Sequence, residues 1–422
     1  MQFSVWGSAN ESADQTIVCS GAADGSSRAL ISATCIDLSL SCMQRIDAYV
    51  QARNAKTLMP NRTSPQILSD KALLDTMMRG QHAAGYAPSS HWGSPESATL
   101  ATLHAVDLND FLTVPNSFGN FPASHLERPN MFRRIGHRLR KEFSRLVGLA
   151  EPPSPLGPII EASCHERMKF MAQQFAEALY NFDNGQSLLQ VEDSLAGNPP
   201  ATFEIANRRY SFQFLHNFTR TQWLLRNLEI PEGACVVEIG PGYGGFIEVL
   251  RKVRPDLRIA LIDIAPQLYI AEQRCKAIFG DSSQGSGSVV GFRTTTNMKT
   301  IDLATFKPGT IAIVAPWQCD RLRNVWLGIN HASMQEMTRP QAASYIAALQ
   351  IANMEHFYLI NYHPGVIGSP DEAVSSDFLV DQFRQCGFSV KVHGPNNKVP
   401  GYQHKAFLFH DYILFERSLQ RQ

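Results

Sequence analysis

Two acidic residues flank a glycine-rich turn in "CVVEIGPGYGGFIEVLRKVRPDLRIALIDIAP", Cys235 to Pro266. Apolar and helical patterns around the turn predict a strand, a turn, a helix and a second strand that ends at Asp263. Glycines lack a Cβ, so such a turn lets the backbone approach a ligand closely. The spacing G-x-G-x-x-G, with an acid about 20 residues further on, also fits a dinucleotide site. The glycines alone therefore leave the ligand open.

Glu238 is more informative, because it lies two residues before Gly240 at the end of the first strand. A carboxylate there would repel a pyrophosphate, and it is costly to bury without a partner or solvent. It suits a ligand with a positively charged end. The arrangement E-x-G-x-G-x-G resembles motif I of the class I S-adenosylmethionine-dependent methyltransferases. A dinucleotide oxidoreductase and a cofactor-binding protein without turnover remain as alternatives.

The resemblance implies a cofactor site built on these residues. Glu238, Gly240, Gly242 and Tyr243 would line the methionine part of S-adenosylmethionine. Asp263 would hold the ribose hydroxyls, with Ile264 beside it.

A second stretch, "IVAPWQCDRLRNVWLGINHASMQEMTRPQAASYI", is similar to a family of sugar O-methyltransferases in its proline-tryptophan turn and in N-x-x-S-x-Q-E-M. "LAGNPP", Leu195 to Pro200, falls at the expected place as well, and the resemblance covers roughly residues 193–358. It implies a hydroxyl on a sugar or sugar-bearing molecule as the methyl acceptor, with a non-sugar natural product, N- or O-methylated, as the alternative. His331 and Met334 depart from the family pattern.

The same stretch adds three candidate cofactor residues, Trp317, Gln318 and Asn330. Trp317 could stack on adenine or belong to the core, and the sequence favours neither.

Methyl transfer to a hydroxyl requires alignment of the acceptor and removal of its proton. His331, just after a strand of the core, is our first candidate for the base, because the pKa of histidine lies near neutrality. His363 in "NYHPG" is the second, and His404 is a weaker third. Glu336 could orient a histidine or cap the helix that starts near Thr338. Each histidine could also be an ordinary hydrogen-bonded residue.

From residue 233 onward, short apolar runs alternate with helical patterns, which is typical of a parallel sheet wrapped by helices. The predicted class is α/β: a Rossmann-like class I methyltransferase sheet with helices on both faces, plus a mainly helical N-terminal region. We expect that region to span residues 1–204, for substrate recognition, as a lid or for dimerisation, and the methyltransferase domain to span 205–422. The predicted strands are Cys235–Ile239, Ile259–Asp263, Val289–Arg293, Ile311–Val314, Val325–Asn330 and Phe357–Asn361, followed by a C-terminal strand pair. The predicted helices are Leu38–Ala55, one within Ser154–Asp183, Tyr210–Leu228, Gly244–Val253, Pro266–Phe279, Arg339–Met354 and Asp377–Cys386.

Composition limits the partners. Lys plus Arg and Asp plus Glu both number 38, so no net positive field attracts nucleic acid or anionic lipid. The basic segment 133–145 is expected to be a solvated amphipathic helix or a docking site for a phosphate or acidic partner. No apolar run approaches a membrane span, and no leader pattern opens the chain, so we expect a cytoplasmic protein acting on a small molecule, with a homodimer as one arrangement. No compact Asp/His cluster predicts a metal.

Overall fold

The computed structural model describes residues 64–84, 99–113, 186–199, 202–205, 207–284, 287–362, 374–395 and 410–418. The chain divides into two compact units, Met1–Leu58 and Met59–Gln422, and all described residues belong to the second. The predicted helices at 38–55 and within 154–183, the basic segment 133–145, His363 and His404 lie outside the described residues. The domain boundary at residue 204 and the roles of the N-terminal region remain predictions.

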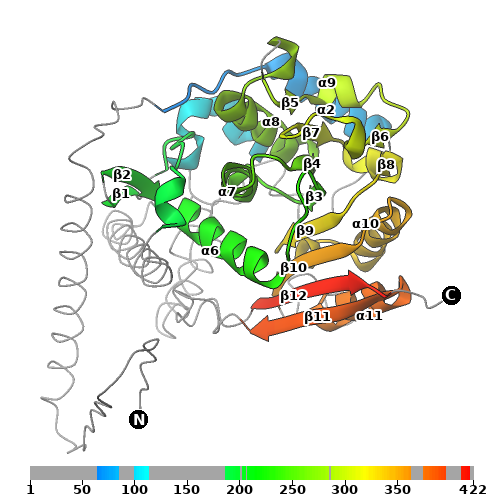
Figure 1. Ribbon diagram of the computed structural model, residues 1–422. Helices are drawn as coiled ribbons and strands as arrows, with labels where there is room; N and C mark the ends of the chain where they lie inside the picture. Colours follow the sequence, from blue (N-terminus) through cyan, green and yellow to red (C-terminus); the bar gives the residue numbers. More distant parts are fainter. Residues whose placement is uncertain are drawn as a thin grey trace, which may run out of the picture. The chain divides into compact units, whose positions relative to one another are not determined.

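The centre of the second unit is an eight-stranded sheet in the order β11-β12-β10-β9-β3-β4-β7-β5 (Figure 1). The strands from β10 to β5 run parallel, and β12 runs antiparallel to both of its neighbours. The bounds are β3 Cys235–Ile239, β4 Arg258–Ile262, β5 Val289–Val290, β7 Ile311–Val314, β9 Leu327–His331, β10 His356–Tyr362, β11 Phe388–Pro395 and β12 His410–Arg417. This mostly parallel, Rossmann-like sheet confirms the predicted fold class, including the C-terminal strand pair.

Helices cover both faces of this sheet. The helix bounds are α2 Lys71–Ala83, α6 Phe212–Asn227, α7 Gly245–Val253, α8 Ala265–Phe279, α9 Phe292–Thr295, α10 Arg339–Ile351 and α11 Ser376–Gln385. α10 and α11 share one buried core with Val237, Ile239 and Leu359 of the strands. The alternate strand residues, such as Val236 and Leu261, are also fully buried and point to the opposite face. Burial of both strand faces explains the continuous apolar runs in the sequence.

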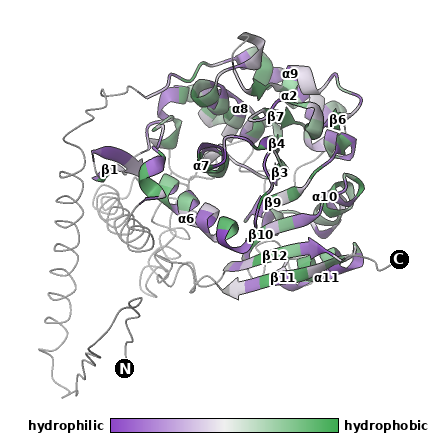
Figure 2. Ribbon diagram, in the orientation of Figure 1, coloured by the Kyte–Doolittle hydropathy of each residue, from purple (hydrophilic) through white to green (hydrophobic). Residues whose placement is uncertain are grey.

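Short elements complete the described part. β1 Thr202–Ile205 and β2 Arg208–Ser211 form a hairpin just before α6, and β6 Ile301–Asp302 pairs with β8 Leu322–Arg323. The 3₁₀ helices are η1 Leu108–Thr113, η3 Leu188–Gln190, η4 Ser282–Gln284, η5 Leu303–Thr305, η6 Pro316–Arg321 and η7 Met334–Glu336. Figure 2 shows that α6 carries both hydrophobic and hydrophilic residues along its length.

One predicted strand was wrong in its second half. Val289–Arg293 was expected to be extended, but β5 ends at Val290 and α9 begins at Phe292. The cause is a tertiary contact: the Phe292 N–H donates to Glu272 Oε2 at 3.1 Å, so a carboxylate of α8 satisfies the start of the short helix. A Cβ at Gly291 would collide with the same carboxylate.

Candidate functional site

The glycine turn follows β3 at the carboxyl edge of the sheet. Gly240, Gly242 and Gly244 have φ values of 71°, 57° and 79°, which residues with a side chain rarely adopt. The Gly240 N–H donates to the Ile262 carbonyl at 2.8 Å, which ties the turn to the end of β4. The turn is therefore fixed between two strand ends before α7 begins.

Asn330 and Ser333 support this turn from the neighbouring strand β9. Asn330 is fully buried; its Nδ2 donates to the Ile239 carbonyl at 2.7 Å, and its Oδ1 accepts the Met334 N–H at 3.1 Å. Ser333 Oγ donates to the same Ile239 carbonyl at 3.1 Å. The N-x-x-S pattern thus bonds to the backbone that leads into the turn. The predicted cofactor contact of Asn330 remains a prediction.

A substitution at Gly240 tests this packing. Gly240→Ala places a Cβ into Ser333 at a positive φ, so we expect the free energy of unfolding to fall by about 2 kcal/mol. Denaturant unfolding measures the change. Gly394→Ala is the matched control, because nothing lies within 4 Å of its Cβ position and no positive φ is recorded there. Equal stability of the Gly240 variant and the wild type would contradict the contact.

Asp263 lies directly after β4 and faces the turn. Its Oδ2 accepts the Gly242 N–H at 2.9 Å, and its Oδ1 accepts the Ile264 N–H at 2.8 Å. Burial raises the pKa of Asp263 to about 7, although both N–H groups oppose the shift. Each carboxylate oxygen keeps accepting capacity for a hydroxyl donor. Ile264 is the N-cap residue of α8.

Glu238 and His331 meet between β3 and β9. Glu238 Oε1 lies 3.4 Å from His331 Nδ1, and the two side chains are 1% and 5% exposed. Among the described residues, Glu238 Oε2 and both ring nitrogens of His331 have no hydrogen-bond partner. Buried polar atoms are almost always paired in native proteins, so this cluster has unused capacity for a ligand.

The surroundings control the charge of this pair. Burial, with a smaller contribution from Asp263, raises the pKa of Glu238 to about 8, and Arg220 of α6 opposes the shift. Burial and Arg220 hold the pKa of His331 well below its usual value. The His331 ring packs edge-on against Phe246 at 4.0 Å and Tyr358 at 5.2 Å between ring centroids. Burial and Arg220 therefore favour the neutral form of His331, and the two aromatic rings hold its orientation.

Trp317 follows β7 in η6, where it is half-buried. It packs edge-on against Phe292, with ring centroids 6.1 Å apart, and lies against Gly80 of α2. Gln318 is buried and uses its amide on backbone: Oε1 accepts the Ala315 N–H at 3.3 Å, and Nε2 donates to the Thr295 carbonyl at 3.0 Å. Gln318 thus shapes the turn that carries Trp317, and cofactor contacts of both residues remain predictions.

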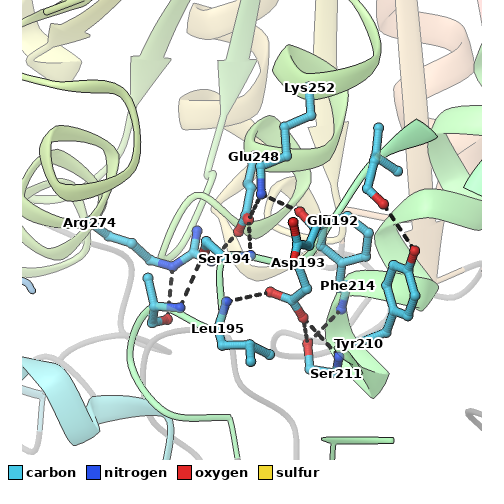
Figure 3. A network of polar contacts seen from close by, with 12 residues as sticks. Glu192, Asp193, Ser194, Leu195, Tyr210, Ser211, Phe214, Glu248, Lys252 and Arg274 are labelled. Carbon is cyan, nitrogen blue, oxygen red and sulfur yellow. Dashed lines mark hydrogen bonds and ion pairs between the residues drawn. The ribbon is translucent and has the colours of Figure 1, made fainter. Parts of the chain in front are cut away.

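Tyr243 of the glycine turn packs beneath Arg274. Arg274 belongs to a buried polar network with Glu248, Lys252 and Asp193 (Figure 3). The Arg274 guanidinium lies 5.1 Å above the Tyr243 ring and forms a buried ion pair with Glu248. Glu248 also pairs with Lys252 at 2.6 Å and accepts the Ser194 N–H at 2.9 Å. Burial raises the pKa of Glu248, but Arg274 and Lys252 outweigh it and hold the pKa at about 2.

The "LAGNPP" loop is attached to this network. Asp193 accepts the Ser211 N–H at 2.8 Å and the Leu195 N–H at 2.8 Å, while burial and Glu248 raise its pKa. The Gly197 carbonyl accepts the Leu112 N–H at 2.9 Å, and φ at Gly197 is 91°. The loop therefore joins η1, the β1–β2 hairpin and the helix after the glycine turn.

Of the predicted catalytic residues, His331 lies beside Glu238 between β3 and β9. Glu336 is half-buried at the end of η7, three residues after Ser333. The cap of α10 is formed by the Thr338 side chain and Gln341, which are joined in a capping box. The catalytic roles of His331, Glu336 and His363 remain predictions.

Sequence reasoning missed Arg220, Phe246 and Tyr358, which surround the Glu238–His331 pair. Arg220 lies on α6, 18 positions before Glu238 in the sequence, and no local motif marks it. The described residues contain no group of three or more His, Cys, Asp or Glu side chains that could hold a metal. Within the same residues, every helix is too short or too polar to cross a membrane.

No family model and no curated protein matches this chain. Among solved structures, similar ones include a magnesium protoporphyrin IX methyltransferase from Synechocystis PCC 6803 with bound S-adenosylmethionine, at 15% identity and a TM-score of 0.32, covering 49% of this chain and 79% of that one. The mitomycin 7-O-methyltransferase has 13% identity, a TM-score of 0.32 and coverage of 68% and 84%. A geranyl diphosphate C-methyltransferase from Streptomyces coelicolor A3(2) has 11% identity, a TM-score of 0.34 and coverage of 47% and 76%.

Proposed function

We propose that this protein is an S-adenosylmethionine-dependent methyltransferase that methylates a hydroxyl of a sugar or sugar-bearing small molecule. The observation that carries the proposal is the meeting of a buried carboxylate with one oxygen free of hydrogen bonds, a glycine turn, a second acid and a buried histidine at one edge of a parallel sheet. Ligands of open α/β sheets bind outside the carboxyl ends of the strands, which is where these residues lie.

The residues fit the cofactor by their chemistry. The Glu238 oxygen without a hydrogen-bond partner suits a cationic group, and the backbone of Gly240 and Gly242 allows close approach. Asp263 would accept hydrogen bonds from the ribose hydroxyls. When bound, S-adenosylmethionine supplies a methyl group on a positively charged sulfur, activated for displacement.

The chain's own groups would handle the acceptor proton. His331 Nδ1 faces Glu238, so an ionised Glu238 favours the tautomer with the proton on Nδ1. Nε2 then keeps its lone pair and accepts the proton of a hydroxyl placed beside it. Phe246 and Tyr358 hold the ring in place, so the base costs little reorganisation.

The acceptor class is supported by the sequence resemblance in "LAGNPP" and N-x-x-S-x-Q-E-M, and O-methylation by the histidine at the strand end. A direct test incubates the protein with S-adenosylmethionine and a panel of glycosides, free sugars and phenols, and follows S-adenosylhomocysteine and methylated product by mass spectrometry. Methylation of glycosides supports the proposal. Cofactor binding without any methyl transfer across the panel would favour a regulatory protein instead.

Asp263→Ala tests the ribose assignment. We expect the Kd for S-adenosylhomocysteine to rise about 10- to 100-fold, because two hydrogen bonds to a charged acceptor are lost. Titration calorimetry measures the change. Asp256→Ala is the control, since Asp256 pairs with Arg254 at 2.7 Å and bonds the Gly233 N–H, before β3 begins. Unchanged affinity in the Asp263 variant would rule out the ribose contact.

A further inference from the structure

Helix α2 packs on α8 and contacts the segments that follow β4 and β7. Gln81 is fully buried, and its Oε1 accepts the Ala265 N–H at 2.8 Å, two residues after Asp263. The adjacent Gly80 lies against Trp317, which follows β7. Two consecutive residues of α2 therefore contact the segments that follow β4 and β7.

Contacts along its length hold α2 in this position. The Asp70 N–H donates to Tyr269 Oη at 2.9 Å, and the Asp70 carboxylate pairs with Arg293 at 3.1 Å. Leu73 and Met77 are buried at 1% and 0% exposure. Asp70 also caps the helix, because its Oδ1 accepts the Leu73 N–H at 2.9 Å. Apolar burial and a capped start make α2 a fixed part of this edge.

The position of a nucleoside base follows from the order of the strands. If Asp263 holds the ribose and the glycine turn after β3 holds the other end of the ligand, the base must extend away from β3. The next strand in that direction is β7, which pairs with β4. Trp317, which follows β7, and Gly80, which contacts it, are both half-buried, so each keeps some accessible surface.

We propose that α2 positions the walls of the adenine pocket: Gly80 sets the place of the Trp317 ring, and Gln81 fixes the backbone after Asp263. This inference rests on the proposed function. The absence of a side chain at Gly80 lets the indole lie against the helix backbone, while the Phe292 ring limits it from another side. Gly80 is thus a positioning residue that acts through Trp317.

The geometry makes position 80 sensitive to size. A Cβ at this position would lie 3.0 Å from Trp317 Cζ2 and 3.8 Å from Phe292 Cζ. Alanine requires the indole to shift by a few tenths of an ångström, whereas the larger leucine side chain must displace the ring from its present position. No positive φ is recorded for Gly80, so the backbone accepts either residue, and alanine is the better helix former.

Calorimetric titration of Gly80→Ala and Gly80→Leu with S-adenosylhomocysteine and 5′-methylthioadenosine tests the proposal. We expect the Kd to rise about threefold for alanine and at least about tenfold for leucine. The factors should be the same for both ligands, because they share the adenosine part. The melting temperature of the alanine variant should equal or exceed that of the wild type, which a merely structural loss would not produce. Arg79→Ala, on the exposed side of the helix, should bind both ligands normally.

The indole itself provides a second measurement. Binding of 5′-methylthioadenosine should quench tryptophan fluorescence in the wild type, and Trp317→Phe should remove most of this signal. Persistence of the full quench in that variant would overturn the proposal, as would wild-type affinity of a folded Gly80→Leu protein. If leucine prevents folding, the alanine variant decides by the same criterion. A wild-type chain that binds neither ligand would overturn the proposed function and this inference together.

Discussion

Glu238→Gln should make the free protein more stable at pH 9 while weakening its affinity for S-adenosylmethionine. The ordinary pKa of this carboxyl is 4.5, and burial raises it to about 8 in the folded protein. The folded state therefore holds the proton more tightly than the unfolded state. The contribution of Glu238 to stability is complete below pH 4.5 and is lost as the pH rises toward 8.

Glutamine resembles the protonated carboxyl in shape and can still donate toward His331 Nδ1, 3.4 Å from Glu238 Oε1. The free energy of unfolding of the variant should match that of the wild type at pH 4.5 and exceed it at pH 9 by on the order of 5 kcal/mol. Denaturant unfolding across this range measures the difference between the two proteins. Parallel stability curves would show that Glu238 is not held protonated.

Ligand binding should show the opposite preference. A cationic cofactor favours the ionised carboxylate, so binding to the wild type releases a proton below about pH 8. Below about pH 8, the affinity of the wild type for S-adenosylmethionine should therefore rise with pH more steeply than the affinity of Glu238→Gln. The difference between the two slopes should reach up to about tenfold per pH unit. Calorimetry in buffers of different ionisation enthalpy counts the protons released. Identical pH slopes for S-adenosylmethionine in both proteins would remove Glu238 from the cationic part of the site.

The glycine turn and its two acids could be predicted because the information is local. Glu238, Gly240 and Asp263 lie within one strand-turn-helix-strand unit. Its pattern predicts the parallel sheet and the carboxyl edge at which the three residues lie. Asn330 was predicted as a cofactor residue, which stays a prediction, and the sequence could not show that its amide donates to the Ile239 carbonyl. That contact depends on β9 lying beside β3, and 91 residues separate the partners.

The rest of the site depends on segments without a chemical pattern. Gly80 and Gln81 lie on a helix that the sequence analysis did not predict, and their contacts with Trp317 and Ala265 cross more than 180 positions. Arg220 influences the Glu238–His331 pair from α6, which was predicted as a helix but not as part of the site. The helical pattern of the sequence predicts α6, whereas only the packed structure shows that Arg220 is the residue of α6 that influences the pair.

His331→Phe should abolish most turnover and leave cofactor binding nearly unchanged. Phenylalanine preserves the edge contacts with Phe246 and Tyr358 but has no nitrogen to accept a proton. A positioned general base raises the rate by about 100- to 10,000-fold. With the hydroxyl acceptor identified from the panel, kcat should therefore decrease by a factor in that range. The Kd for S-adenosylhomocysteine should stay within about threefold of the wild type.

The pH profile separates a base from a packing role. Burial and Arg220 lower the pKa of His331. The kcat of the wild type should therefore fall only at acidic pH, below the ordinary histidine pKa of 6.5. The residual activity of the variant should lack this step. His356→Phe is the control. This half-buried histidine is the first residue of β10, and its ring centroid lies 4.7 Å from that of Trp326, whereas His331 pairs with Ile360 near the other end of that strand. A His331→Phe protein that turns over normally would exclude His331 as the base and shift the role to another group near the acceptor.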